Sequence, residues 1–398
     1  MTRMSLARRA LWRTRRLILT RGDGAGTAGP LVVAGFFRTA SGVGQSARAC
    51  AAGLRRHGYA PLCVDVSAAF GQEDLDPGLD LAPMPRASGG VLILHANAPE
   101  TERALFELGL WRGRGWRVIG YWAWELDVAP PGWADAARHL AELWTPSAFV
   151  ADTFRESVGR PVKVVPHYVE TPPLAPPRGG ATVCLAMADG RSSFHRKNLL
   201  GAVAAFRRAA AARDDVRLIV KTRNLGEYPQ DAAALAAATG GDPRIETLDR
   251  SLPPAEQKAL IAAADIVISL HRSEGFGLVL AEAMAAGKAV VTTAWSGNMD
   301  FTDADVAMMV PARLAAADDP SGVYAQDGGR WAEPDIDAAA TMLSRLFDDR
   351  GLRERLGRKA RDRVRERLDG ADDRPGPGRV RAGAPGGGGG PQADRPPG

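Results

Sequence analysis

SLHRSEGFGLVLAEA, residues 269–283, is the stretch from which the fold of this chain can be inferred, because it leads from a strand into a helix through a glycine-rich turn. Gly275 and Gly277 let the backbone approach a ligand, and the first turn of a helix presents free N–H groups and partial positive charge. Two acids, Glu274 and Glu282, flank this turn eight residues apart. The pattern predicts a strand–turn–helix unit that can bind an anionic ligand.

The residues around this stretch continue the same alternation of strands and helices from residue 181 to residue 293. Continuously apolar strands separated by helices indicate a parallel sheet that is covered on both faces. The predicted strands are ATVCLAMA, VRLIVKT, RIETL, DIVISL and KAVVTT, and the predicted helices are NLLGAVAAFRRAAAA, PAEQKALIAAA and LVLAEAMAAG.

A second series of the same kind precedes it, with strands LVVAGFF, APLCVDV, GVLILHA, WRVIGYWAW, ELWTPS and PVKVVPHYV and a helix at GQSARACAAGLRRHG. The proline-rich run ETPPLAPPRGG, residues 170–180, separates the two series and is typical of a hinge. The sequence therefore predicts an α/β protein with two Rossmann-like domains, residues 29–169 and 181–334, that face each other across a cleft. Helices at 335–368 close the fold. Ligands of such sheets bind at the carboxyl ends of the strands.

The net charge of +5 comes from one end of the chain. Residues 1–28 contain seven arginines and one acid, so the remaining 44 basic and 45 acidic residues nearly balance. A nearly neutral body argues against a nucleic-acid partner, which needs a broad basic face. We expect residues 1–28 to be either a disordered leader or a helix on an anionic membrane surface, and residues 369–398, rich in glycine and proline, to be a disordered tail.

The cysteines and histidines indicate neither disulfides nor a metal site. Cys50, Cys63 and Cys184 are odd in number and have no C-x-x-C spacing, so we expect free thiols in a reducing cytoplasm. The six histidines have no metal-ligand spacing. No apolar run approaches the roughly 18 residues of a membrane span.

A dinucleotide-binding pattern in the first domain offers a different hypothesis. Gly42, Gly44 and Ala47 fit G-x-G-x-x-A after a strand, and Asp65 ends the next strand. An NAD-dependent oxidoreductase is therefore an alternative function. The residues RTAS between the strand and Gly42 count against it, because the dinucleotide turn follows its strand directly. The same loop could approach any anionic or hydroxyl-rich ligand.

The spacing of Glu274 and Glu282 argues against a hydrolytic pair. Glu274 precedes the predicted helix and Glu282 lies about one turn inside it, which at a rise of about 1.5 Å per residue predicts a separation near 10 Å. The carboxylates of glycosidases lie closer together, about 5 to 9.5 Å apart. Two separated acceptors with N–H donors between them suit a ligand with hydroxyls at both ends and an anion in the middle, such as a nucleotide sugar.

Cations are needed beside these acids, because carboxylates repel a pyrophosphate. The run SSFHRKN, residues 192–198, follows the first strand of the second domain and provides Arg196 and Lys197. In a parallel sheet this loop opens on the same edge as the Glu274 loop. Arg196 could bind two phosphate oxygens at once, and Lys197 could add a point charge.

These segments resemble a known family. HRSEGFGLVLAEAMAAGKAVVTT, residues 271–293, is similar to the E-x7-E element of the retaining glycosyltransferases of family 4, the glycogen-synthase-like group with the GT-B fold. SSFHRKN resembles the phosphate loop of that family, and GYWAWELDVAPPGW, ELWTPSAFV and AWSGNMDF resemble segments of its bacterial, group 1 members. The resemblance runs in order from about residue 31 to about residue 368.

The resemblance implies a role for each matching residue of the second domain. Glu274 would meet the donor sugar, Glu282 would hold the ribose, and Arg196 and Lys197 would bind the phosphates. The backbone of the turn would contact the donor through Gly275, Phe276, Gly277 and Leu278.

One position departs from the family pattern. Many members carry an arginine five residues before the lysine, where this chain has Ser192. Arg196 or Arg191 would then have to supply the missing charge.

By the same resemblance, the first domain contributes from the other side of the cleft and serves the acceptor. His95, at the end of the strand GVLILHA, is the candidate to face the donor sugar, with a structural histidine held by nearby backbone as the alternative. Gly42 and Gly44 would bring backbone near the donor phosphates or the acceptor. Glu125 is a candidate acceptor contact, whereas His167 and the neighbouring tryptophans, Trp122, Trp124 and Trp133, suit a structural role better.

The sequence thus predicts a cytoplasmic glycosyltransferase that moves a hexose, such as mannose or glucose, from a nucleotide-diphosphate donor to an acceptor hydroxyl with retention of configuration. The acceptor would be a glycan, a lipid-linked molecule or another hydroxyl compound, in glycan or polysaccharide biosynthesis. The family mechanism has no protein nucleophile and needs no D-x-D metal loop, so we expect turnover without a metal or a cofactor beyond the donor. A nucleotide-sugar-binding protein without catalysis is the alternative.

Overall fold

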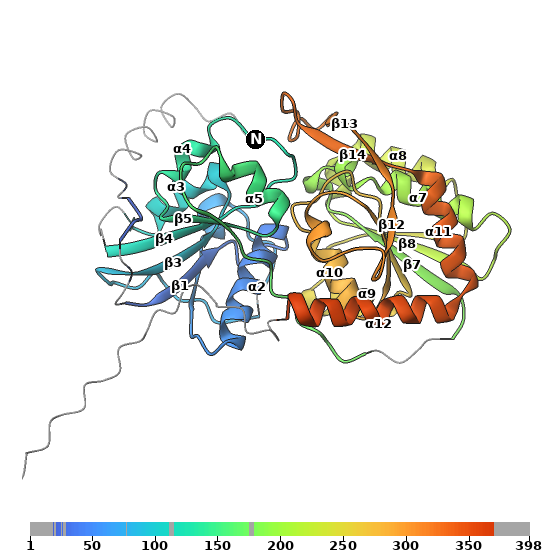
Figure 1. The fold of residues 1–398 in the computed structure, drawn as a ribbon, viewed down its shortest axis with the longest axis horizontal. Coiled ribbons are helices and arrows are strands. Elements are labelled where there is room, and N and C mark those ends of the chain that lie inside the picture. The colour runs from blue at the N-terminus through green and yellow to red at the C-terminus, as the bar shows by residue number, and fades with distance from the viewer. Residues whose placement is uncertain are drawn as a thin grey trace, which may run out of the picture.

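A computed structural model of the chain describes residues 29–76, 78–110, 115–174 and 179–369, together with residues 19, 21–24 and 26. Two α/β domains lie side by side, the N-terminal one blue to green and the C-terminal one light green to red (Figure 1). Each is built on a six-stranded sheet, which confirms the two Rossmann-like domains predicted from the sequence. Most of the basic leader 1–28, and the tail from residue 370, lie outside the described residues.

The N-terminal sheet is entirely parallel, with the strand order β2-β1-β3-β4-β5-β6. Gly35 pairs with Asp65 on one side and with His95 on the other, so the carboxyl ends of three strands are level. The strands are β1 (Leu31–Gly35), β2 (Leu62–Asp65), β3 (Gly89–His95), β4 (Gly115–Tyr121), β5 (Glu142–Thr145) and β6 (Val162–Val164). The helices are α2 (Gly42–Arg56), α3 (Ala98–Glu107), α4 (Trp133–Ala137) and α5 (Ala148–Arg155), with a 3-10 turn η1 (Ser67–Phe70).

The C-terminal sheet is also parallel, with the order β12-β11-β10-β7-β8-β9. Its strands are β7 (Thr182–Met187), β8 (Val216–Thr222), β9 (Ile245–Asp249), β10 (Ile266–Ser269), β11 (Ala289–Thr293) and β12 (Met308–Val310). Its helices are α6 (Phe194–Lys197), α7 (Leu199–Ala209), α8 (Pro229–Thr239), α9 (Pro254–Ala263) and α10 (Leu278–Ala285), with 3-10 turns η3 (Gly190–Ser192), η4 (Leu225–Glu227) and η5 (Gly297–Asp300).

An antiparallel hairpin that the sequence did not reveal follows this sheet. It consists of β13 (Ala312–Ala316) and β14 (Arg330–Pro334), and its register pairs Leu314 with Ala332. In Figure 1 the hairpin lies at the top of the C-terminal domain, close to the N-terminal domain. Apolar alternation in this segment is weak, because one strand, ARLAA, is largely exposed.

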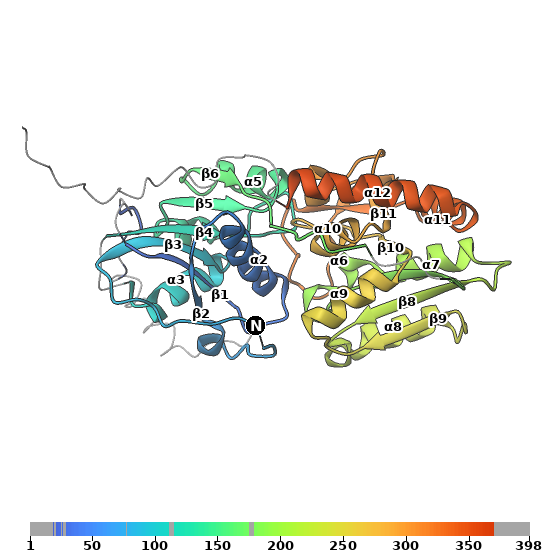
Figure 2. The same ribbon diagram turned by 90° about the horizontal axis from the view of Figure 1, so that it is seen from below.

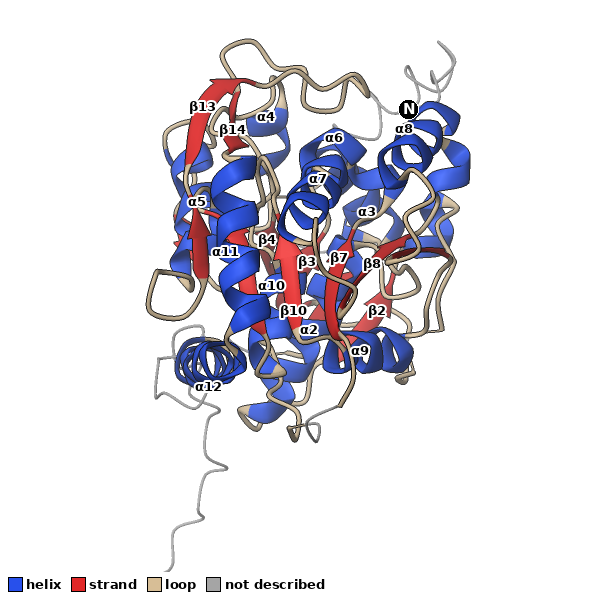
Figure 3. Cartoon of the chain, turned by 90° about the vertical axis from the view of Figure 1, so that its right-hand side faces the viewer, coloured by secondary structure: helices blue, strands red, loops and turns tan. Residues whose placement is uncertain are grey.

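Two helices close the chain, as expected for residues 335–368. Helix α11 (Ile336–Asp348) packs on α7, and α12 (Arg350–Arg367) packs on α10 and β11. Both lie along one edge of the C-terminal domain (Figure 2), and α12 is seen end-on in Figure 3. The end of α12 returns to the segment that leaves the N-terminal domain, where the Val169 amide donates to the Leu368 carbonyl at 3.0 Å.

The domain cores explain which sequence features are structural. Trp122, Trp124 and Trp133 pack together in the core of the N-terminal domain, each at most 8% exposed, which supports the interpretation that they form core rather than a sugar platform.

The three cysteines are free thiols, as expected. None of the described helices has the length and run of apolar residues that a bilayer span would demand.

The contact between α12 and the strand–turn–helix unit generates a stability prediction. A Cβ at Gly357 would lie 2.0 Å from the carbonyl oxygen of Gly287, which is backbone and cannot give way cheaply. We expect Gly357→Ala to lower the free energy of unfolding by about 2 kcal/mol or more, because overpacking forces α12 away from α10. Thermal unfolding followed by circular dichroism measures the change.

Gly351→Ala, in the first turn of the same helix, is the matched control. A Cβ there meets only the side-chain ends of Arg355 and Asp349, at 3.1 and 3.2 Å. Alanine should therefore leave the stability unchanged or raise it slightly. Equal effects of the two substitutions would contradict the packing described for α12.

Candidate active site

A cavity of about 770 Å³ lies between the two domains. Its walls are the loops that follow β1, β3 and β4 in one domain and β7, β8 and β10 in the other, so it occupies the sheet edge expected for ligands of this fold. The residues predicted to bind a donor that line it are Gly42, Arg196, Lys197, Glu274, Gly275, Phe276, Gly277, Leu278 and Glu282.

The glycine-rich turn after β10 presents the start of helix α10 to this cavity. Gly277 adopts a left-handed conformation (φ +96°) at the N-cap, where no side chain caps the helix. The N–H groups of the first turn, from Leu278 to Leu280, therefore have no partner within the helix and line the cavity. The carbonyl oxygen of Gly275 packs closely against Gly297, where a Cβ would lie only 2.2 Å from that oxygen. The free N–H groups at the start of α10 suit an anionic ligand.

Glu274 is a buried carboxylate held by two cations. Its side chain is 11% exposed, and it accepts a hydrogen bond from Lys197 Nζ while Arg196 Nη1 lies 3.3 Å from its second oxygen. Burial alone would raise the pKa of Glu274, but the charges of Lys197 and Arg196 hold that pKa at about 2. The carboxylate is therefore ionised at any physiological pH and keeps both cations at the mouth of the turn.

Arg196 is more deeply buried than its expected role on phosphates would suggest. Its side chain is 1% exposed, Nη1 donates to the Ser273 carbonyl at 2.6 Å, and Nη2 donates to Ser192 Oγ at 2.7 Å. Its two Nη groups are thus bonded to protein atoms, whereas Nε has no partner among the described residues, and Arg196 acts first as a support for Glu274. Lys197, with a side chain 19% exposed, is the cation of this pair that a ligand can reach more readily.

The loop that carries this pair is shaped by two left-handed residues. Ser193 (φ 57°) caps α6 by accepting from the Arg196 amide at 3.1 Å, and Asn198 (φ 51°) caps α7 by accepting from the Gly201 amide at 3.1 Å. Asn198 also donates to the Leu270 carbonyl at 2.8 Å, which ties this loop to the loop of Glu274. The run SSFHRKN therefore folds into two consecutive caps that fix the directions of Arg196 and Lys197.

Glu282 lies further along α10 and faces the N-terminal domain. Its Oε1 accepts from Gln45 Nε2 of α2 at 3.4 Å. Burial raises the pKa of Glu282 to about 7, against the opposing effects of Lys258 and of a hydrogen bond with Gln257. The carboxyl of Glu282 thus lines the same cavity as Glu274.

The loop before α2 reaches the cavity, but it is built differently from a dinucleotide turn. Ser41 caps the helix by accepting from the Gly44 amide at 3.2 Å, and a Cβ at Gly44 would lie 2.4 Å from Thr39 Oγ1. Gly44 therefore serves close packing, and it does not line the cavity, whereas Gly42 faces open space. Asp65 bonds the Ser67 hydroxyl at 2.7 Å and lies outside the cavity lining, which removes the acid that the oxidoreductase hypothesis requires.

His95 lies at the end of β3, and its side chain is not among those that line the cavity. It is fully buried, its Nδ1 lies 2.7 Å from Ser46 Oγ, and its ring stacks on Tyr121 at 4.4 Å. Burial, together with the neighbouring His167, lowers the pKa of His95 well below its usual range. His95 pairs in register with Tyr121 of β4, and its buried Nε2 has no hydrogen-bond partner among the described residues. His167 does line the cavity, with Nδ1 3.1 Å from the Tyr121 hydroxyl.

Several cations of the cavity were missed by sequence reasoning because they come from unrelated loops. Lys221 and Arg223 lie at the end of β8, and Arg48 faces them from α2. Burial and the nearby Arg223 lower the pKa of Lys221 to about 8. Arg223 pairs with Asp189, and its Nη1 finds no partner among the described residues. In the sequence, only the basic residues of VKTRN pointed to these cations. Isolated basic residues usually lie on the solvated surface, so they did not indicate a binding site.

Arg191, which could have replaced the missing family arginine, forms an exposed ion pair with Glu227 at 2.5 Å. It still lines the outer part of the cavity. A ligand that draws Arg191 inward would have to compete with this pair.

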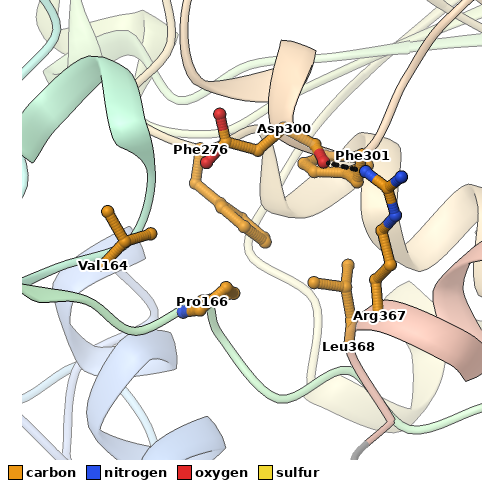
Figure 4. Close-up of a pocket in the computed structure, with 7 residues that line it drawn as sticks. All are labelled: Val164, Pro166, Phe276, Asp300, Phe301, Arg367 and Leu368. Carbon is orange, nitrogen blue, oxygen red and sulfur yellow. Dashed lines mark hydrogen bonds between the residues drawn. The ribbon is translucent and has the colours of Figure 1, made fainter. Parts of the chain in front are cut away.

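A second cavity, of about 470 Å³, lies behind the glycine-rich turn (Figure 4). Phe276 lines both cavities, and its ring packs on His167 and on Phe301. Arg367 donates to the Asp300 carbonyl at 2.7 Å on the far side. Phe276 thus separates the inter-domain cavity from this second cavity, which the end of α12 borders.

Comparisons with known proteins agree with this fold and site. Residues 191–363 match the model of the family Glycosyl transferases group 1, which covers most of the C-terminal domain with its two glutamates and its basic pair. Two proteins named D-inositol 3-phosphate glycosyltransferase, from Corynebacterium efficiens and Salinispora tropica, are 34% identical over 137 residues and 36% identical over 174 residues. The matches cover 34% and 42% of this chain, and only 27% and 31% of those relatives.

Solved structures extend the likeness to both domains. HepE of Anabaena, in complex with UDP and glucose, has a TM-score of 0.59 at 14% identity, covering 86% of this chain and 96% of that chain. WaaG, a glycosyltransferase involved in lipopolysaccharide biosynthesis, has a TM-score of 0.56 at 17% identity, covering 85% and 96%. The chain therefore has the GT-B fold, as its sequence predicted.

The raised pKa of Glu282 generates a prediction about stability. The folded chain keeps this proton up to about pH 7, whereas the unfolded chain loses it near pH 4.5, so the free energy of unfolding falls as the pH rises through this window. The limit is about 1.4 kcal/mol per pH unit. Glu282→Gln removes the effect, so its stability relative to the natural chain should increase from pH 5 to about pH 7 and level off by pH 8.

Thermal unfolding of both proteins across this pH range measures the difference. Glu366→Gln, on the exposed side of α12, is the control and should give a curve parallel to that of the natural chain. A parallel curve for Glu282→Gln as well would show that the Glu282 carboxyl is not desolvated.

Proposed function

We propose that the protein is a retaining glycosyltransferase that transfers a sugar from a nucleotide-diphosphate donor to an acceptor hydroxyl. One observation carries this proposal. The buried carboxylate of Glu274, with Lys197 bound to it, stands directly before the uncapped start of helix α10. A diphosphate fits between Lys197 and the free N–H groups, and the sugar that it carries then lies against Glu274.

The charge of the cavity supports an anionic donor. Seven basic and five acidic side chains line it, and the acids include Glu274 and Glu282, which would accept hydroxyl groups. The excess of basic side chains favours an anionic ligand such as a diphosphate. The cations are distributed over both domains, since Arg48 faces Arg223 across the cleft.

The chemistry assigned to these residues is electrostatic. The bond between the anomeric carbon and the diphosphate oxygen breaks, the acceptor oxygen forms the new bond on the same face, and its proton passes to the departing diphosphate. Lys197 and the start of α10 stabilise the negative charge that grows on the leaving group. Arg196 holds Glu274 in place, and Glu274 orients the sugar. The E-x7-E spacing supports the retaining, family 4 assignment.

The similar solved structures suggest hypotheses about the donor and about the cellular location of the reaction. HepE was crystallised with UDP and glucose, so UDP-hexoses are the first donors to test, followed by GDP- and ADP-sugars. The acceptor would be a glycan, a lipid-linked molecule or another hydroxyl compound, in the cytoplasm or at the inner face of the membrane. We also propose that turnover needs no metal, so that EDTA should leave the rate unchanged.

The second candidate is a protein that binds a nucleotide sugar without turning it over. The favouring observation is that both Nη groups of Arg196 are bonded to protein atoms. Such a protein would be stabilised by the donor but would release no nucleoside diphosphate with any acceptor.

Substitution of the central pair tests the catalytic proposal. We expect Lys197→Ala and Glu274→Gln each to lower transfer by about a hundredfold or more, because one removes the charge on the leaving group and the other removes the sugar contact. Release of nucleoside diphosphate, measured with the donor that gives the largest thermal shift, reports the rate.

Lys359→Ala and Glu366→Gln, on exposed positions of α12, are the matched controls and should keep full activity. Circular dichroism should show all four variants folded. Normal turnover by a folded Lys197→Ala or Glu274→Gln protein would refute the assignment.

A further inference from the structure

The β13–β14 hairpin with its connecting loop, residues 312–334, reaches from the C-terminal domain to the N-terminal domain; we call it the cross-domain hairpin. The Arg330 amide and Nε donate to the carboxylate of Asp127 at 2.9 and 2.8 Å. The Tyr324 hydroxyl donates to Glu125 Oε2 at 2.9 Å, and its ring packs on Trp124 with centroids 5.1 Å apart. Contacts to Trp124, Glu125 and Asp127 thus join the hairpin to one loop of the opposite domain.

The same segment also holds the loop of Arg196 and Lys197. Asp319, only 5% exposed, accepts from the Ser193 hydroxyl at 2.9 Å and from the Tyr324 amide at 3.1 Å. Ser193 is the residue that caps α6 beneath Arg196. A single carboxylate therefore connects the N-terminal cap of α6 to the residue that contacts the other domain.

Arg196 lies at the point where these contacts meet. Its guanidinium lies over the Tyr324 ring, 5.2 Å from the centroid. Its Nη1 is 3.3 Å from Glu274, and its Nη2 is 3.9 Å from Glu125 of the N-terminal domain. Two carboxylates, one from each domain, thus share one buried cation, and Tyr324 touches both the cation and the second carboxylate.

We propose that the cross-domain hairpin couples closure of the two domains to assembly of the site, with Tyr324 and Glu125 as positioning residues. This inference rests on the proposed transferase function. Separation of the domains breaks the contacts of Tyr324 and Arg330 and removes Glu125 from Arg196. The buried guanidinium then loses the counter-charge of Glu125 and becomes open to water, so the support that it gives to Glu274 is less rigid.

The consequence for the reaction is control of water. In the closed state the site is complete and dry, so the acceptor hydroxyl takes the sugar. When closure is weakened, water reaches the bound donor and hydrolyses it to free sugar and nucleoside diphosphate. The ratio of hydrolysis to transfer therefore reports the hairpin contacts, whereas a general loss of fold or of donor binding lowers both rates together.

Tyr324→Phe is the sharpest test, because it removes one hydroxyl and keeps the ring on Trp124 and Arg196. Loss of a hydrogen bond to a charged group should shift the closing equilibrium about tenfold. We expect the ratio of hydrolysis to transfer to rise by about that factor in Tyr324→Phe and in Glu125→Gln, while the donor concentration at half-maximal rate changes little. Val323→Ala, exposed in the same loop, is the control and should match the natural chain.

A second measurement does not depend on activity. Small-angle X-ray scattering of the full chain should give a larger radius of gyration for the double variant Tyr324→Ala/Asp127→Asn than for the natural chain, and an unchanged one for Val323→Ala. An active enzyme whose ratio stays constant in Tyr324→Phe and Glu125→Gln, or a double variant that stays compact, would overturn the coupling. If the natural chain turned over no nucleotide sugar, the transferase proposal would fail, and scattering would still decide whether the hairpin holds the domains together.

Discussion

The site depends on a single buried carboxylate. Glu274, from the loop after β10, is desolvated and stays ionised only because Arg196 and Lys197, from the loop after β7, lie against it. Removal of a buried partner would leave an uncompensated charge, which costs several kcal/mol. The two loops are therefore fixed relative to each other, and Lys197 and the uncapped start of α10 line the same cavity.

The same turn is also a point of contact between the domains. The Ser147 hydroxyl of the N-terminal domain donates to the Gly275 carbonyl at 2.7 Å, and the Ala148 amide donates to Asp300 at 2.7 Å. The absence of a side chain at Gly275 allows this approach, since a Cβ there would lie 3.1 Å from the Trp124 carbonyl oxygen. The glycines of the turn thus serve two purposes, the exposure of N–H groups to a ligand and the close approach of the opposite domain.

Much of this organisation could be predicted from the sequence. The continuously apolar strands predicted both parallel sheets. The run from Glu274 to Glu282 predicted the strand–turn–helix unit. Its place at the ligand edge followed because all loops after the strands of a parallel sheet open on the same edge. The buried state of Arg196 could not be predicted, since it depends on carbonyls and carboxylates from distant loops. His95 stands at the end of its strand as expected, but its side chain packs under Tyr121, and periodicity does not report which way a terminal residue points. Lys221 reaches the cavity through tertiary packing, which a sequence pattern does not report.

The most direct test of the central claim is a crystal structure of the chain with an intact nucleotide sugar bound. We predict the diphosphate on the N–H groups of residues 278–280 and within hydrogen-bond reach of Lys197, with the sugar against Glu274 and the ribose against Glu282. A diphosphate held instead by the loop around Gly42, with the start of α10 unoccupied, would contradict the assignment of the donor site.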